Sequence, residues 1–248
     1  MNNVIARIQS TGKVLAPDGE GYEAFPTSMS RSEGEAVYEM VKGMGARRTL
    51  EVGFAYGMST MHICEALRGR NGALHVVIDP FQSSTWHNIG LLNLERAGLR
   101  SLVEFHEASS DKVLPQLHAR HLEFDFALID GAHLFDYAFV DFFYVDKMLR
   151  LGAVVCMDDL WMPAMQKVCR YYVRNRGYQI VRGVIPRPVH ARIRELAKAA
   201  LGAATTAALR RAVRRTRESG TATTPLLFLR KLCDVPSVDR RDHHMADF

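Results

Sequence analysis

The chain has 248 residues, of which 48% are hydrophobic and 24% are charged. This composition is sufficient for a sizeable core and excludes bulk disorder. The sequence has no apolar run of the ~18 residues that a transmembrane helix needs, and its start lacks the apolar region of a secretory signal. We therefore expect no transmembrane segment, a cytoplasmic location and reduced thiols at the four scattered cysteines, none of which forms a CxxC pair.

Residues 1–30 contain glycine, proline and serine without a clear hydrophobic period. We expect them to form an N-terminal arm or a loosely packed cap. The main domain is then expected to cover residues 31–248. Its first element is a predicted helix that Ser30 or Ser32 caps and that runs to about Lys42.

Apolar runs and helical patterns alternate along the next part of the chain. The strand-like runs occupy residues 48–53, 73–79, 102–107, 124–130 and 153–159. The helical patterns occupy residues 58–69, 85–98, 110–117, 134–152 and 163–177. Two last strands are predicted at 178–185 and 225–232. This alternation predicts an α/β fold with a doubly wound, mostly parallel, seven-stranded sheet.

A basic segment separates the last two predicted strands. The net charge is +5, whereas residues 187–218 alone contain nine Arg or Lys and two Glu. The alanine, leucine and arginine content predicts a basic helical insertion over residues 187–222, broken near Gly202. It is expected to be a lid over a binding site, a clamp for an acidic substrate, a contact with anionic membranes, a nucleic-acid patch or a solvated insertion. No specific nucleic acid is expected, because the segment has no aromatic residue on which bases would stack.

The turn after the first strand of the sheet carries two glycines, Gly53 and Gly57. In open α/β sheets, ligands bind beyond the carboxyl ends of the strands, and glycines allow the sharp turns found there. The GxxxG spacing departs from the GxGxxG of dinucleotide-binding folds, and no GK[ST] of a P-loop follows. Asp79 ends the next strand, where a carboxylate can accept hydrogen bonds from both hydroxyls of a ribose.

The pattern ExGxxxGxS, followed by this strand-terminal acid, resembles the first motif of class I methyltransferases that use S-adenosylmethionine (SAM). The resemblance covers roughly residues 30–175 and implies a Rossmann-like methyltransferase fold that binds SAM and releases S-adenosylhomocysteine (SAH). It implies that Ser59 helps to hold the methionine carboxylate, although Ser59 is equally expected as a plain helix cap. Asp79 would hold the ribose. The resemblance implies further cofactor contacts at Glu51, Gly53, Phe54, Gly57, Ala108, Ser109, Ser110 and Asp130.

Carboxylates also follow two other predicted strands. Asp130 ends one of them, and the pair Asp158 and Asp159 ends its neighbour. Converging carboxylates repel one another unless a cation lies between them, and their oxygen ligands suit Mg²⁺, or else Ca²⁺ or Mn²⁺. The alternative for the pair is a solvated loop or a helix cap.

These acids resemble the metal ligands of cation-dependent O-methyltransferases such as catechol O-methyltransferase. The sequence Asp130-Gly-Ala-His133 resembles still more closely the DGxH motif of bacterial natural-product and sugar O-methyltransferases. The resemblance implies that His133 is the general base, and its ordinary pKa of about 6.5 suits that role. The alternative is a structural histidine that caps the following helix.

The favoured prediction is a SAM-dependent O-methyltransferase that acts on a hydroxyl of a natural product, a sugar or a phenol and is assisted by a divalent cation. The alternatives are a metal-independent small-molecule methyltransferase and a nucleic-acid-associated protein that keeps a SAM-type fold. The aromatic-rich helix at 134–152 and the N-terminal arm favour a homo-oligomer. Trp86, His87 and Trp161 are expected either to shape the acceptor pocket or to pack, and His62 and His75 are expected to be structural.

Overall fold

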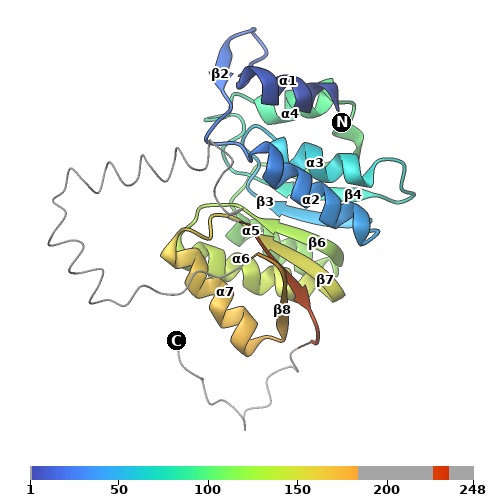
Figure 1. The fold of residues 1–248 in the computed structure, drawn as a ribbon, viewed down its shortest axis with the longest axis vertical. Coiled ribbons are helices and arrows are strands. Elements are labelled where there is room, and N and C mark those ends of the chain that lie inside the picture. Colours follow the sequence, from blue (N-terminus) through green and yellow to red (C-terminus); the bar gives the residue numbers. More distant parts are fainter. Residues whose placement is uncertain (1, 184–225, 235–248) are drawn as a thin grey trace, which may run out of the picture.

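The computed structural model describes residues 2–183 and 226–234 (Figure 1). The predicted basic insertion at 187–222 lies outside the described residues. A mixed sheet of seven strands runs through the described part of the chain in the order β5-β4-β3-β6-β7-β9-β8. Its strands are β3 (Arg48–Val52), β4 (Leu74–Ile78), β5 (Val103–His106), β6 (Phe124–Ile129), β7 (Leu149–Met157), β8 (Tyr178–Arg182) and β9 (Leu227–Lys231).

The strands from β5 to β7 are parallel, and β9 pairs in the antiparallel sense with both β7 and β8. Helices cover both faces of the sheet, with α5, α6 and α7 on one side and α2, α3 and α4 on the other (Figure 1). These helices are α2 (Arg31–Gly43), α3 (Met58–Leu67), α4 (Ile89–Arg96), α5 (Ser110–Ala119), α6 (Phe135–Met148) and α7 (Pro163–Asn175). A short 3-10 turn, η1 (Arg100–Leu102), precedes β5. The predicted α/β, doubly wound architecture is confirmed. None of the helices in the described ranges is long and apolar enough to cross a membrane.

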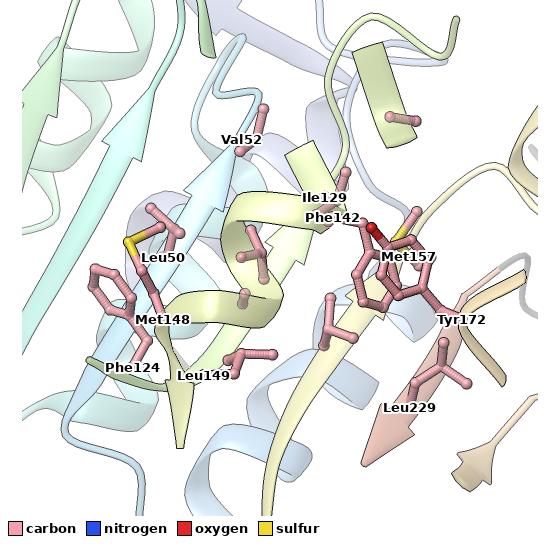
Figure 2. Close-up of a cluster of buried hydrophobic side chains, with 14 of the residues drawn as sticks. Leu50, Val52, Phe124, Ile129, Phe142, Met148, Leu149, Met157, Tyr172 and Leu229 are labelled. Atoms are coloured by element: carbon pink, nitrogen blue, oxygen red, sulfur yellow. The ribbon is translucent and has the colours of Figure 1, made fainter. Parts of the chain in front are cut away.

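Alternation of side chains along the strands explains both covered faces. Leu50 and Val52 of β3 pack into the buried cluster that α5, α6 and α7 cover (Figure 2). Phe142 of α6 and Tyr172 of α7 stack in that cluster with ring centroids 3.6 Å apart. The intervening Glu51 faces the other side of the sheet, where α3 lies. Strand β3 therefore buries apolar side chains on one face of the sheet and the carboxyl side chain of Glu51 on the other.

The N-terminal segment is packed more tightly than the sequence suggested. It forms α1 (Asn3–Thr11) and a hairpin of β1 (Lys13–Leu15) and β2 (Gly21–Glu23). Ile5 and Ile8 are fully buried in a cluster with residues of α3 and α4. The Asn2 side chain caps α1 and donates to the Ala97 carbonyl oxygen at 3.0 Å. The expectation of a loosely packed segment is wrong because these two isoleucines, three positions apart, share one helix face.

Two predicted boundaries also differ from the structure. Residues 149–152 belong to β7, not to the preceding helix, because Leu149 already pairs with Phe124 of β6. The helix expected from residue 85 begins only at Ile89, since His87 and Asn88 have φ angles of 50° and 57°, outside the helical range. Residues 80–88 thus form a loop at the carboxyl end of β4.

Candidate functional site

A cavity of about 650 Å³ opens at the carboxyl ends of β3, β4, β6 and β7. This volume lies within the 300–1,000 Å³ typical of small-molecule sites. Its walls come from residues 26–29, 52–56, 58–59, 78–81, 109–110 and 130–134, with Trp86, Tyr137 and Asp159. Three aspartates and a histidine line it, but no lysine or arginine of the described residues does.

The two glycines of the β3–α3 turn are required by packing. Gly53 has φ +97°, and a Cβ atom there would lie 2.1 Å from the carbonyl oxygen of Asp130. Gly57 has φ +78°, and a Cβ atom there would lie 2.8 Å from the ring of Phe54. Gly53 and Phe54 line the cavity, whereas Gly57 does not. The turn after β3 therefore touches the turn after β6 directly, which joins the two halves of the site.

Asp79 holds this turn in place. Its Oδ2 accepts hydrogen bonds from the backbone N–H groups of Phe54 and Ala55, at 3.0 and 2.9 Å. Its Oδ1 accepts from the Phe81 N–H at 2.7 Å. A carboxylate offers about four acceptor positions, so one remains for a ligand in the cavity. The predicted ribose acid is thus at the cavity wall, although it is largely committed to the backbone.

The other predicted cofactor residues divide into two groups. Ser59, Ser109 and Ser110 line the cavity as expected. Glu51 and Ala108 do not line it. Glu51 is fully buried behind Ser59 and accepts hydrogen bonds from the hydroxyls of Ser59 and Thr60. Glu51 therefore reaches the cavity only through Ser59, because β3 turns its side chain toward α3, and its contact with the cofactor stays a prediction.

Asp130, His133 and Asp159 come together at the other end of the cavity. One oxygen of each carboxylate and one ring nitrogen of the histidine all lie within 4.8 Å of one another. His133 Nε2 lies 3.1 Å from Asp130 Oδ1 and 3.1 Å from Asp159 Oδ2. These three residues form what we call the acid–histidine cluster.

Asp158, the third predicted metal ligand, is not one of the three residues of the acid–histidine cluster, and its role as a ligand stays a prediction. It is fully buried, and its Oδ1 accepts the backbone N–H of Asp159 at 2.5 Å. Trp161 supports Asp159 from the other side, since its Nε1 donates to Asp159 Oδ1 at 2.7 Å. Asp158 and Trp161 therefore position Asp159.

Several cavity residues were not predicted. Residues 26–29 reach the cavity from the N-terminal segment, and no motif marked them. Three aromatic residues also line the cavity: Tyr56, Phe81 and Tyr137. Each lies within four positions of a predicted site residue, and this closeness in the sequence is what could have identified them. Trp86 lines the cavity, as one of its two readings expected, whereas His87 stacks on Tyr22 with ring centroids 4.8 Å apart.

Comparisons with known proteins agree with this geometry. Residues 50–160 match the model of a methyltransferase domain family. The chain is 27% identical over 145 residues to a caffeoyl-CoA O-methyltransferase of Populus kitakamiensis, which covers 56% of this chain and 58% of that protein. It is 36% identical over 142 residues to tricin synthase 1 of Oryza sativa subsp. japonica, and this match covers 53% of this chain and 53% of that protein. The chain thus spans little more than half the length of these relatives.

Solved structures show the same fold. The O-methyltransferase of Streptomyces achromogenes involved in tomaymycin synthesis, solved in complex with SAM, superposes with a TM-score of 0.63 at 18% identity. That match covers 94% of this chain and 91% of the other. An O-methyltransferase of Bacillus cereus in complex with SAH gives a TM-score of 0.55 at 24% identity over 63% of this chain and 75% of the other. Residues 50–160 thus match a methyltransferase domain, and the chain shares the fold of O-methyltransferases that were solved with SAM or SAH.

Proposed function

We propose that this protein transfers a methyl group from SAM to a hydroxyl of a small molecule. The observation that carries the proposal is that one cavity contains both the Asp79-anchored turn and the acid–histidine cluster. A cofactor bound along the turn and an acceptor bound at the cluster would meet inside it. Such proximity is what an in-line displacement requires.

The turn fits the nucleoside half of SAM. Asp79 retains an acceptor position for a ribose hydroxyl. Ser109 and Ser110, after β5, supply polar groups on the side of the cavity where the resemblance expects adenine. The largely apolar remainder of the wall matches the lining of cofactor sites in general.

The acid–histidine cluster fits a divalent cation. Its two carboxylate oxygens and imidazole nitrogen are close enough to share one ion, and they are ligands that Mg²⁺ or Mn²⁺ accepts. We assign Asp130 and Asp159 as the protein ligands and Asp158 as the residue that orients Asp159. A bound cation would lower the pKa of an acceptor hydroxyl and fix its direction.

His133 is assigned as the general base. Its side chain is partly exposed to the cavity and lies beside both proposed ligands, where an acceptor hydroxyl would be held. The imidazole would take the hydroxyl proton as the oxygen forms a bond to the methyl carbon. The bond from that carbon to the cofactor sulfur breaks at the same time, so neutral SAH leaves.

The walls beyond His133 favour an acceptor with an apolar ring. Leu134 is 55% exposed and Tyr137 is 40% exposed, and both line the cavity. Exposed apolar side chains at a cavity wall are typical of a ligand site. The acceptor is accordingly a hydroxylated small molecule with a planar or apolar body.

The buried free thiols of Cys64, Cys156 and Cys169 agree with the expected cytoplasmic location, and the homo-oligomer stays a prediction.

Methyl transfer from labelled SAM to a panel of catechols, phenols and sugars tests the proposal. EDTA should stop transfer to the accepted compound, and added Mg²⁺ or Mn²⁺ should restore it. His133→Ala should lower turnover by about 10²–10⁴-fold while SAH affinity and Mn²⁺ affinity stay within a few-fold of wild type. Loss of Mn²⁺ binding in this variant would make His133 a ligand instead of the base. Activity that EDTA does not change would contradict the cation.

A further inference from the structure

Helix α6 exposes apolar side chains on the side that faces away from the sheet. Its buried residues, among them Phe142 and Val145, pack into the core cluster beneath the helix. On the opposite side, Phe135, Val140 and Phe143 are 41%, 37% and 38% exposed. Single exposed apolar residues are ordinary, whereas several on one helix face mark a surface that something else covers.

Aromatic contacts extend this side of α6 onto α7, which lies beside it on the same face of the sheet (Figure 1). Phe139 stacks on Phe135 with ring centroids 5.8 Å apart and meets the ring of Tyr171 edge-on at 5.0 Å. Helix α7 contains three basic residues and no acidic one. Two of the basic residues, Lys167 and Arg174, are exposed and lie seven positions apart, so they share one side of the helix.

The exposed side chains of the two helices carry more positive than negative charge. Lys147 adds a third exposed cation, and its Nζ lies 4.8 Å from the centroid of the Phe143 ring. Asp136 is the exposed acid of α6, whereas Asp141 is buried and Asp146 is partly buried. We call this surface the α6–α7 face. Its apolar members are Phe135, Val140 and Phe143, and its charged members are Asp136, Lys147, Lys167 and Arg174.

The chemistry of the α6–α7 face favours one kind of partner. A two-fold contact with a second copy would press a positively charged surface against itself. Single-stranded nucleic acid needs open ring faces on which bases stack, whereas Phe135 already stacks on Phe139 and Lys147 lies over Phe143. An anionic lipid surface needs only apolar side chains that enter the head-group region and cations that meet the lipid phosphates.

We propose that the α6–α7 face docks on anionic phospholipid membranes. Phe135, Val140 and Phe143 enter the head-group region, and the three exposed cations lie against the lipid phosphates. Such docking is reversible, and it is independent of the proposed methyl transfer. Leu134 and Tyr137, at the start of the same helix, line the cavity, so docking would hold the cavity close to the lipid.

Co-sedimentation of the full chain with lipid vesicles tests the docking. We expect binding to phosphatidylcholine vesicles that contain about 30% phosphatidylglycerol, none to pure phosphatidylcholine, and weaker binding in about 1 M NaCl. Lys167→Gln combined with Arg174→Gln should lower the partition constant about 20-fold, since each cation near an anionic surface contributes about fivefold. Val140→Ser combined with Phe143→Ser should lower it at least about tenfold, because less apolar surface leaves water.

Matched controls replace exposed residues outside the α6–α7 face. Arg7→Gln combined with Lys13→Gln removes two exposed cations of the N-terminal segment, and Leu151→Ser removes an apolar side chain that is 60% exposed. Each control should change the partition constant by less than about twofold. Direct insertion is measured with tryptophan probes: brominated lipid should quench the fluorescence added by Val140→Trp and leave that added by Leu151→Trp unchanged.

Four results would overturn the assignment. The first is a wild-type protein that does not bind the anionic vesicles. The second is equal binding by the wild type and both α6–α7 variants, which would place any vesicle contact in the basic segment at 187–222, outside the described residues. The third is unchanged vesicle binding with a dimer that Val140→Ser and Phe143→Ser dissociate in sedimentation velocity, which would make a second copy the partner. The fourth is unchanged vesicle binding with single-stranded DNA binding that the same variants abolish.

Discussion

His133 and Asp159 share an uncommon backbone conformation. Each has φ 55°, in the left-handed region that non-glycine residues rarely adopt. Such conformations cost of order 1–3 kcal/mol and persist where the surrounding structure enforces them, often at functional sites. For Asp159, the Asp158 carboxylate and the Trp161 indole supply that enforcement. The acid–histidine cluster is therefore built in advance of any ligand.

Trp161→Phe tests this support. The substitution keeps an aromatic ring but removes the N–H that donates to Asp159 Oδ1. Residues that orient metal ligands typically contribute about 10–100-fold to affinity, so we expect a loss of that size for Mn²⁺ in a calorimetric titration. Trp86→Phe, at a cavity tryptophan outside the cluster, is the control and should change Mn²⁺ affinity little. Equal affinities for Trp161→Phe and wild type would contradict the supporting role.

His62 of α3 should make stability depend on pH. Burial lowers the pKa of His62 to about 4, and its Nε2 has no hydrogen-bond partner among the described residues. Between pH 6.5 and 4 the unfolded chain binds a proton that the folded chain does not, so stability falls as the pH falls through that window. The loss is about 2 kcal/mol between pH 7 and pH 5. Urea unfolding of His62→Leu at both pH values should lack this loss.

Asp141 of α6 acts in the opposite direction. Burial raises the pKa of Asp141 to about 6, so the folded chain binds a proton that the unfolded chain releases, and stability rises as the pH falls from 6 toward 3.8. The two effects partly cancel in the wild-type protein. The difference in the free energy of unfolding between His62→Leu and the wild-type protein isolates the contribution of the histidine. If that difference is the same at pH 7 and at pH 5, His62 does not cause the loss of stability.

The sequence was informative about residues that follow strands and uninformative about side chains within them. Asp79, Asp130 and Asp159 stand at the carboxyl ends of parallel strands, so their convergence follows from topology alone. The direction of Glu51 depends on which face of β3 meets α3, and nothing local in the sequence specifies it. His75 likewise carried no signal, because its partner Glu51 lies 24 residues away.

At the scale of elements, the antiparallel strand β9 is held by a buried charge. Lys231 is 4% exposed, and its Nζ donates to the carbonyl oxygens of Asp146 and Leu149 at 2.7 and 3.0 Å. The same Nζ lies 3.6 Å from Asp146 Oδ1 and 2.7 Å from Asp234 Oδ1. This lysine ties the last described strand to the point where α6 passes into β7.

Lys231→Met should lower the free energy of unfolding by about 3 kcal/mol, because it leaves two buried carbonyl groups without this donor and removes the positive charge beside the Asp146 carboxylate, which keeps only its hydrogen bond from Tyr178. Urea unfolding with tryptophan fluorescence measures it. Arg230→Met on the same strand is the control, since Arg230 is exposed, and it should change stability by less than about 0.5 kcal/mol. Similar losses in both variants would mean that Lys231 contributes no more than strand propensity.

Proline and glycine marked one boundary of an element correctly and another wrongly. Pro163 opens α7 as expected. Residues 149–152 were misassigned because Gly152 looks like the end of a helix, whereas it lies inside β7 with φ +80°. The hairpin of β1 and β2 is too short to show an alternating pattern in the sequence. It is held in place by tertiary contacts with α4, such as the 2.8 Å hydrogen bond that Arg96 donates to the Leu15 carbonyl oxygen.

At the scale of the whole molecule, the sheet places two chemically different half-sites in one cavity. The doubly wound, mostly parallel architecture followed from the alternation of elements, which is why it was predictable, whereas the strand order came from the structure. The return of residues 26–29 to the cavity wall was not, because it depends on how the N-terminal segment docks beside α4. Long-range docking of this kind leaves no short-range pattern in the sequence.

The central claim is that this cavity binds SAM, and calorimetric titration of SAH into the full chain tests it most directly. We expect micromolar binding to the wild-type protein, clear weakening by Asp79→Asn and no change by Asp111→Asn, which alters an exposed acid outside the cavity wall. Asp79→Asn keeps the size of the side chain but weakens its acceptance of ribose and backbone donors. The absence of SAH binding to the wild-type protein, or equal binding by both variants, would contradict the account.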